Sequence, residues 1–233
     1  MKNLLYKELK LCVPLQTWIF IFLSITIMIP SWPSLVSFFY PLAGITVVFT
    51  LSNANRDLLY TSILPLRKKD VVKGKVLLIS FLEIISMLVS LPFGFLKLFL
   101  QKGLPEEQIY PELGFNLALY GFVFLVFGVF NLICFPWYYK KPEAKVTLPF
   151  LISDLVTILL ISFIMAVFIL FPEFASYVNS YELPNLLTQI AILLGGLLSF
   201  LGFTFLASHL AQKEFPKGRY LVTNEFNCYP KGA

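Results

Sequence analysis

Two carboxylate side chains, Glu83 and Asp154, lie within long apolar stretches of the sequence. By helical rise, Glu83 lies ~12 Å beyond Lys75. Asp154 lies ~13 Å beyond Lys145 by the same measure, which predicts similar depths for the two carboxylates. A carboxylate inside a membrane is a candidate site for a proton, an ion or a cationic substrate. The alternative is structural, with both groups facing a helix bundle and pairing with Lys73, Lys75 or Lys145.

Other polar side chains and several small residues also fall within the apolar stretches. Asn116 and Asn131 are expected to form hydrogen bonds between helices, and so is Gln189. Small residues favour close packing of helices. They gather on two stretches, with Gly121 and Gly128 on one and Gly195, Gly196 and Ser199 on the other.

Nucleotide hydrolysis needs a glycine-rich phosphate loop such as G-x-x-x-x-G-K-[ST], which the sequence lacks. Gly74-Lys75 is the nearest approach, but the earlier glycine is missing and Val76 follows in place of a hydroxyl residue. The three cysteines, at 12, 134 and 228, show no metal-ligand spacing. We therefore expect no catalytic residue, metal or cofactor in this chain, so that any ATP hydrolysis belongs to another chain.

The composition and the apolar runs that position these groups predict an all-α polytopic membrane protein. Of the 233 residues, 58% are apolar and 13% are charged, too few charges to cover a soluble domain of this length. A helix needs about 20 apolar residues to cross the hydrocarbon core. Six runs qualify: 14–30, 34–52, 76–100, 114–138, 147–171 and 185–210. They form one transmembrane domain over 13–210, followed by a tail over 211–233.

The basic residues alternate between the two sides of this arrangement. Lysine and arginine are concentrated in the two termini and in the loops after the second and fourth spans, while the other loops carry mainly glutamate. Positive charge marks the cytoplasmic side, so both termini are predicted to be cytoplasmic. An odd number of spans would scramble this alternation. The net charge of +5 therefore indicates membrane orientation and does not predict nucleic-acid binding.

Residues 1–12 can form an amphipathic helix that lies in the inner membrane interface. Asn3, Lys7 and Lys10 share one face, and leucines occupy most of the remainder, with Glu8 interrupting them. Pro14 separates this helix from the first span. The alternative is an ordinary positive flank that only orients the first span.

The loop between the second and third spans combines basic residues with exposed leucines. Asn55 is placed to cap a short helix over 56–64 that ends at Pro65. Asp70 is expected to cap the inner end of the third span. The apolar side chains on this cytoplasmic helix, at Leu58, Leu59, Ile63 and Leu64, favour docking to a partner or to the membrane surface.

The chain resembles the permease subunit of an ABC-2 type exporter, in the half-size subfamily without an ATPase domain and close to exporters of amphipathic peptide toxins. The resemblance is carried by Leu4-Leu5-Tyr6-Lys7-Glu8-Leu9 and by Leu64-Pro65-Leu66-Arg67-Lys68-Lys69-Asp70-Val71-Val72-x-x-Lys75. It implies a coupling helix that docks into an ATPase subunit, formed by Arg56, Asp57, Leu58, Leu59, Tyr60, Ile63 and Leu64. Pro65, Arg67, Lys68 and Lys69 would form its exit. The outer segment 172–184 is short for the family, which leaves little room for large outer re-entrant helices.

The resemblance further implies two ATPase subunits, which bind ATP and Mg²⁺, and a second permease that is a copy or a paralogue. The expected function is export of an amphipathic or hydrophobic molecule, a peptide or a lipid, across a bacterial plasma membrane. Two alternatives remain open. One is an ion-coupled secondary transporter that uses Glu83 and Asp154, and the other is a non-transporting adaptor or immunity subunit.

Overall fold

The computed structural model describes residues 2–55, 67–102, 113–140, 147–180 and 182–215, and these are almost entirely helical, with no strand among them. In chain order the elements are α1 (Lys2–Cys12), α2 (Leu15–Phe22), the 3₁₀ helices η1 (Leu23–Met28) and η2 (Val36–Phe38), α3 (Phe39–Ala54), α5 (Lys68–Gln101), α6 (Leu117–Lys140), α7 (Thr147–Leu170), α8 (Pro172–Asn179) and α9 (Leu183–Glu214). The all-α fold class is confirmed for the described residues.

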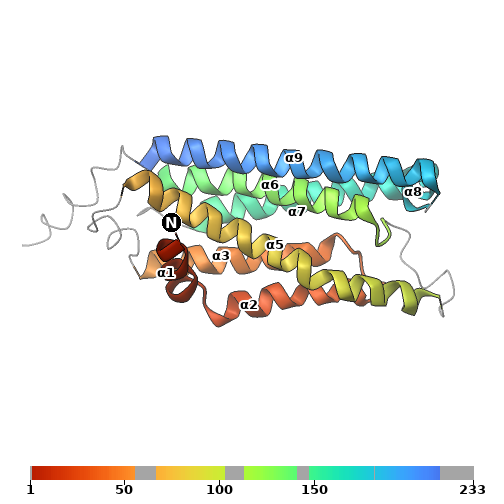
Figure 1. Ribbon diagram of the computed structural model, residues 1–233, viewed down its shortest axis with the longest axis horizontal. Coiled ribbons are helices and arrows are strands. Elements are labelled where there is room, and N and C mark those ends of the chain that lie inside the picture. The colour runs from red at the N-terminus through yellow and green to blue at the C-terminus, as the bar shows by residue number, and fades with distance from the viewer. Residues whose placement is uncertain (1, 56–66, 103–112, 141–146, 181, 216–233) are drawn as a thin grey trace, which may run out of the picture.

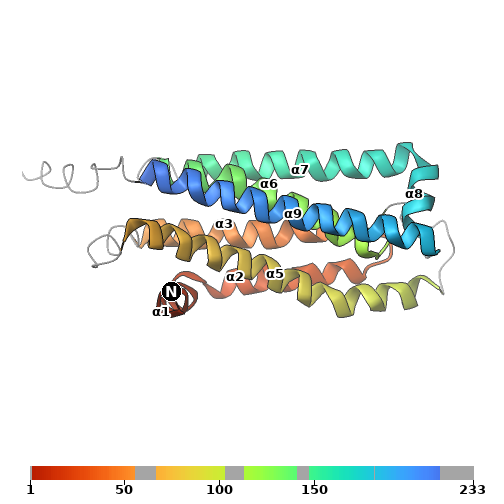
Figure 2. The same ribbon diagram turned by 45° about the horizontal axis from the view of Figure 1, so that its top comes forward.

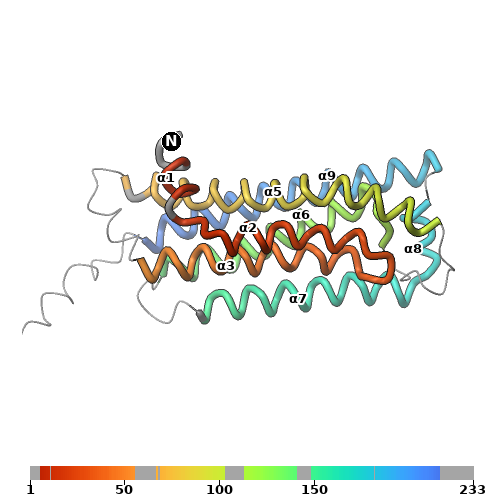
Figure 3. Tube along the Cα trace, turned by 90° about the horizontal axis from the view of Figure 1, so that it is seen from below, coloured from red at the N-terminus to blue at the C-terminus, as the bar shows by residue number. Residues whose placement is uncertain are grey.

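The long helices run side by side along the long axis of the molecule (Figures 1 and 2). Helix α1 instead lies across that axis, at the end where α3 finishes and α5 begins (Figure 3). The end of α9 lies at this same end of the bundle (Figure 1). Helix α8 lies at the opposite end, between α7 and α9. The predicted cytoplasmic side is therefore the end that carries α1, and we refer to it as the inner end.

Among the described residues, five helices are long and apolar enough to cross a membrane: Val36–Ala54, Lys69–Gln101, Leu117–Lys140, Leu148–Leu170 and Leu183–Glu214. Five of the six predicted spans thus correspond to a helix of sufficient length and apolar composition. The first predicted span, 14–30, forms a shorter apolar helix over Leu15–Met28. Half of it is 3₁₀ helix, so it covers about 24 Å against the ~30 Å of a hydrocarbon core. Its crossing of the membrane stays a prediction.

The change from α2 to the 3₁₀ helix η1 has a local cause. The Ser24 hydroxyl donates to the carbonyl of Ile21 (2.7 Å) and the Thr26 hydroxyl to that of Leu23 (2.8 Å). Hydroxyls bonded to carbonyls three residues back, together with β-branched residues, favour the tighter winding. The Thr17 hydroxyl also donates to Gly44 O (3.0 Å), which ties α2 to α3 in an antiparallel hairpin.

Proline residues mark several helix boundaries. Pro14 separates α1 from α2 as predicted, and Pro172 and Pro184 stand in the first turns of α8 and α9. Proline is favoured there because the first helical amides have no partner within the helix. The start of α5 differs from the prediction. It begins at Lys68 with Arg67 as N-cap, so Asp70 lies in the first turn and is not the cap. A carboxylate in the first turn is still favourable to the helix dipole.

Glycines let α6 and α9 pack with their backbones in contact. A Cβ atom on Gly196 would overlap the backbone carbonyl of Gly121, and one on Gly121 would lie 2.6 Å from Ile192 O. On α6, Gly128 packs against Phe200. The predicted small-residue face is confirmed for Gly121, Gly128 and Gly196. Gly195 faces away, because a Cβ atom there meets nothing within 4 Å.

Candidate functional site

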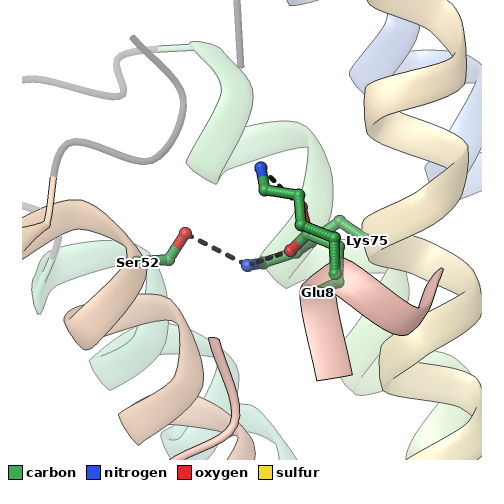
Figure 4. Close-up of polar contacts among 4 residues, drawn as sticks. Glu8, Ser52 and Lys75 are labelled. Carbon is green, nitrogen blue, oxygen red and sulfur yellow. Dashed lines mark hydrogen bonds and ion pairs between the residues drawn. The ribbon is translucent and has the colours of Figure 1, made fainter. Parts of the chain in front are cut away.

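A buried ion pair, together with a hydrogen bond from the same lysine, joins three helices near the inner end of the bundle (Figure 4). The Lys75 ammonium group on α5 donates to Glu8 Oε2 on α1 (3.0 Å) and to Ser52 Oγ on α3 (3.0 Å). All three residues are at most 3% exposed. A buried charge is tolerated only when it is paired and hydrogen-bonded, and Lys75 meets both conditions. We call Glu8, Ser52 and Lys75 the inner triad.

The inner triad connects the two helices that flank residues 56–66. Ser52 lies two residues before the end of α3, and Lys75 lies two turns after the start of α5. Helix α1 packs against both α3 and α5. The segment predicted to form the coupling helix is therefore anchored at both ends to helices that one lysine holds together with α1.

The inner triad changes two expectations for the charged residues. Lys75, expected to pair with a membrane-embedded carboxylate, pairs with Glu8, and Lys73 is exposed. The role of Glu8 was not recognised from the sequence. Its position among leucines on α1 was the available signal, because a carboxylate on an apolar face requires a buried cation. Ser52 carried no such signal.

A second polar group joins α5, α6 and α9 deeper in the bundle. Asn131 Nδ2 on α6 donates to Glu83 Oε2 on α5 (3.0 Å) and to Thr204 Oγ1 on α9 (3.3 Å). Glu83 and Asn131 are 0% exposed. The expectation that Asn131 makes hydrogen bonds between helices is confirmed. The expected lysine partner of Glu83 is replaced by an asparagine, because the amide of Asn131 occupies the position next to its carboxylate.

Asp154 on α7 shares this part of the bundle with Glu83. Both carboxyl groups lie within electrostatic range of the Cys134 thiol on α6. Asp154 is only partly buried, and its Oδ1 atom has no hydrogen-bond partner among the described residues. The two predicted carboxylates thus lie near a common neighbour, although no hydrogen bond joins them.

At the outer end, Lys97 donates hydrogen bonds to the turn between η1 and η2. Its ammonium group donates to Ser34 Oγ (2.6 Å) and to Trp32 O (3.2 Å), and the side chain is 2% exposed. The chain makes a tight turn around 30–33, with Trp32 N bonded to Ile29 O (3.1 Å). This role of Lys97 is not predictable from the sequence, which gives no measure of burial.

Asn116 forms a hydrogen bond to another helix, as expected, and also caps α6. It directly precedes α6, and its Oδ1 atom accepts a hydrogen bond from Leu119 N (2.9 Å), the contact made by an N-cap. Its Nδ2 donates to Asn179 Oδ1 (3.0 Å) at the end of α8. The predicted span over 114–138 therefore begins three residues too early.

Gln189 on α9 completes the attachment of α8 by donating to Val178 O (2.7 Å).

A model of the family described as ABC-2 family transporter protein matches residues 3–215. The chain belongs to the ABC-2 transporter family. No curated protein and no solved structure gives a significant match to it. Members of this family are the membrane components of transporters and work in general with an ABC ATPase. The resemblance noted in the sequence is confirmed at this level.

The predicted coupling segment of this ABC-2 protein lies largely outside the described residues. This applies to every residue from Arg56 to Pro65. Arg67 and Lys69 are described and are exposed at the start of α5, at the inner end of the bundle. Within the described ranges, no group of three histidine, cysteine, aspartate or glutamate side chains is arranged to hold a metal ion.

Proposed function

We propose that this ABC-2 protein is the membrane-spanning permease of an ATP-driven exporter whose ATPase is a separate subunit. The observation that carries the proposal is the family match over 3–215, which covers every described helix except the first residue of α1. The chain has no phosphate-binding loop of its own. Energy for transport would therefore come from the partner, through the segment over 56–64.

The inner triad supports this route for the motion. A push on residues 56–64 acts on the end of α3 and the start of α5, which Lys75 joins through Ser52 and Glu8. Packed helices joined by buried polar contacts move together and do not deform continuously. The movement of the ATPases would thus reach α1, α3 and α5 as one unit.

The proposed complex contains two permeases, identical or related, and two ATPases in a bacterial plasma membrane. Its proposed substrate is amphipathic or hydrophobic, a peptide or a lipid-like molecule. The lining of the bundle surface supports this class. A groove of about 480 Å³ between the start of α3 and α7 is bounded almost entirely by apolar side chains, among them Val36, Phe39, Ile161 and Met165. Such a surface accommodates hydrocarbon and offers little to a water-soluble solute.

The test is co-purification of the chain with its ATPase from native membranes, using the unaltered chain and the double variant Leu58→Asp with Leu59→Asp. We expect the unaltered chain to retain the ATPase and the double variant to lose it while its thermal unfolding is unchanged. The control is Leu183→Asp, which places a carboxylate on an exposed leucine at the opposite end of the bundle and should leave the complex intact.

Two outcomes would overturn the proposal. If no ATPase accompanies the unaltered chain, and uptake or efflux follows an ion gradient that Glu83→Gln with Asp154→Asn abolishes, the protein is a secondary transporter. If the chain recruits a partner without moving any substrate, it is an adaptor or immunity subunit.

A further inference from the structure

The environment of Glu83 contains two polar atoms that one proton would satisfy. Glu83 Oε1 and Asn131 Oδ1 are both buried, and neither has a hydrogen-bond partner among the described residues. Both atoms belong to head groups that are already joined by the hydrogen bond from Asn131 Nδ2 to Glu83 Oε2 (3.0 Å). A buried polar atom without a partner is costly, and two such atoms on one bonded pair need a common explanation.

The donors of Asn131 are fully used in this arrangement. Its amide nitrogen carries two N–H groups, and they donate to Glu83 Oε2 and to Thr204 Oγ1. The amide oxygen can only accept. An ionised Glu83 can also only accept, so that neither its second oxygen nor the amide oxygen could supply a hydrogen to the other. A neutral Glu83 carries an O–H group, which is the donor that both oxygens lack.

No described residue forms an ion pair that would hold the anion of Glu83. The nearest lysine on its own helix, Lys75, lies two turns away and is bound to Glu8 and Ser52. Cys134 on α6 interacts electrostatically with Glu83 and with Asp154 on α7, and neither Cys134 nor Asp154 supplies positive charge. An isolated carboxylate in a low-dielectric interior takes up a proton.

We propose that Glu83 is a proton-binding site, and that its neutral carboxyl group forms a cyclic pair with the Asn131 carboxamide. In this pair Asn131 Nδ2 donates to Glu83 Oε2, and the proton on Glu83 Oε1 is donated to Asn131 Oδ1. The two hydrogen bonds join α5 to α6, and the remaining N–H of Asn131 extends the contact to Thr204 on α9. The pair thus holds three helices together without placing a charge inside the membrane.

This inference does not rest on the proposed export function, and its test needs no ATPase or substrate. The chain is purified into lipid bilayers, and its infrared spectrum is recorded near neutral pH for the unaltered protein and for Glu83→Gln. We expect the unaltered protein to show the carbonyl stretch of a protonated carboxylic acid, shifted in D₂O, that Glu83→Gln removes. Asp154→Asn is the matched control and should leave this band in place.

Two further variants test the pairing itself. Glutamine can form the same cyclic pair through its amide, so Glu83→Gln should keep the midpoint of thermal unfolding close to that of the unaltered protein. Glu83→Leu should lower it. Asn131→Leu should shift the carboxyl band without removing it, because the proton stays on Glu83 but loses its acceptor. This last variant also provides a reading if Glu83→Gln does not fold.

Three results would overturn the inference. The first is a difference spectrum between the unaltered protein and Glu83→Gln that contains only carboxylate bands. The second is a carboxyl band that Asn131→Leu leaves unshifted, which would place the proton outside the pair. The third is a carboxylate band that depends on added Na⁺ or K⁺, together with a thermal stabilisation by that cation, which would make Glu83 an ion site.

Discussion

Lys75 and Glu8 are 67 positions apart in the sequence, yet the ammonium nitrogen of one lies 3.0 Å from a carboxylate oxygen of the other with both side chains buried. Through this contact the terminal helix α1 packs as part of the bundle. It also places the only buried ion pair among the described residues beside the segment that we propose for ATPase docking.

Removing one partner of this ion pair should destabilise the protein strongly. We expect Glu8→Gln or Lys75→Gln to cost about 3–5 kcal/mol, because each leaves an uncompensated buried charge or an unmatched partner. The double variant should recover most of this loss, since two neutral amides can bond to each other. Thermal unfolding in detergent measures the effect. Lys73→Gln, on the exposed face of the same helix, is the control. Additive losses in the double variant would contradict a direct pair.

The contact between α6 and α9 predicts opposite outcomes at two adjacent glycines. Gly196→Ala should destabilise the protein by about 1–3 kcal/mol, because the added methyl group overlaps the backbone of Gly121. Gly195→Ala should cause no loss, since a Cβ atom there meets nothing and alanine favours the helix. Both midpoints of thermal unfolding can be compared directly. Equal effects would show that α9 is rotated relative to the arrangement described above.

Lys97 should stabilise the outer hairpin. Lys97→Met removes the hydrogen bonds to Ser34 and Trp32, and each bond from a charged donor contributes about 1.5–3 kcal/mol. We expect a lower unfolding midpoint and faster proteolysis at 30–33. Lys102→Met removes an exposed lysine five residues further on and should change the stability by less than about 0.5 kcal/mol. Similar behaviour of the two variants would rule out a specific role for Lys97.

The two functions of Asn116 can be separated by substitution. Asn116→Ala removes both the cap of α6 and the bond to Asn179, and a lost cap alone costs about 0.5–2 kcal/mol. Asn116→Asp keeps the acceptor that caps α6 and loses only the donor toward α8. The aspartate variant should therefore be more stable than the alanine variant in thermal unfolding. The reverse order would mean that a carboxylate placed beside the acceptor Asn179 Oδ1 costs more stability than the cap contributes.

The orientation and the first crossing can be read from single cysteines in a background with Cys228→Ser. Ser31→Cys and Lys102→Cys should react with an impermeant maleimide in intact cells, since both positions are exposed at the outer end. Lys140→Cys should react only after the membrane is opened. If Lys102→Cys is labelled and Ser31→Cys is not, α2 and η1 do not complete the crossing of the membrane.

Hydropathy located the long helices because a span is recognised from the summed hydropathy of about 20 residues. Contacts with neighbouring helices do not change that sum. The boundaries were less accurate. The start of α5 at Lys68 and the cap at Asn116 depend on single hydrogen bonds, which composition does not reveal. Helix α8 was expected to be a connection, because a helix of eight residues is too short for its hydrophobic period to be recognised in the sequence.

The polar contacts of the bundle were only partly predictable for a different reason. That Glu83 and Asn131 matter followed from their type, since polar groups inside a membrane need partners. Which partner each one has is a matter of distance between helices that are far apart in sequence. The assignment of Lys75 to Glu8, and not to Glu83, depends on α1 folding back against α5, which no local pattern encodes.

The unequal lengths of the helices have a consequence for the surrounding lipid. Helices α5 and α9 are 34 and 32 residues long, whereas the helix over Leu15–Met28 has 14. Where α2 and η1 cross the membrane as predicted, their length falls short of the hydrocarbon core by roughly 6 Å. Lipids relieve such hydrophobic mismatch by shortening locally. The bilayer beside α2 is then thinner than the bilayer beside α9, and an amphipathic molecule has its shortest path across the membrane along this side of the protein.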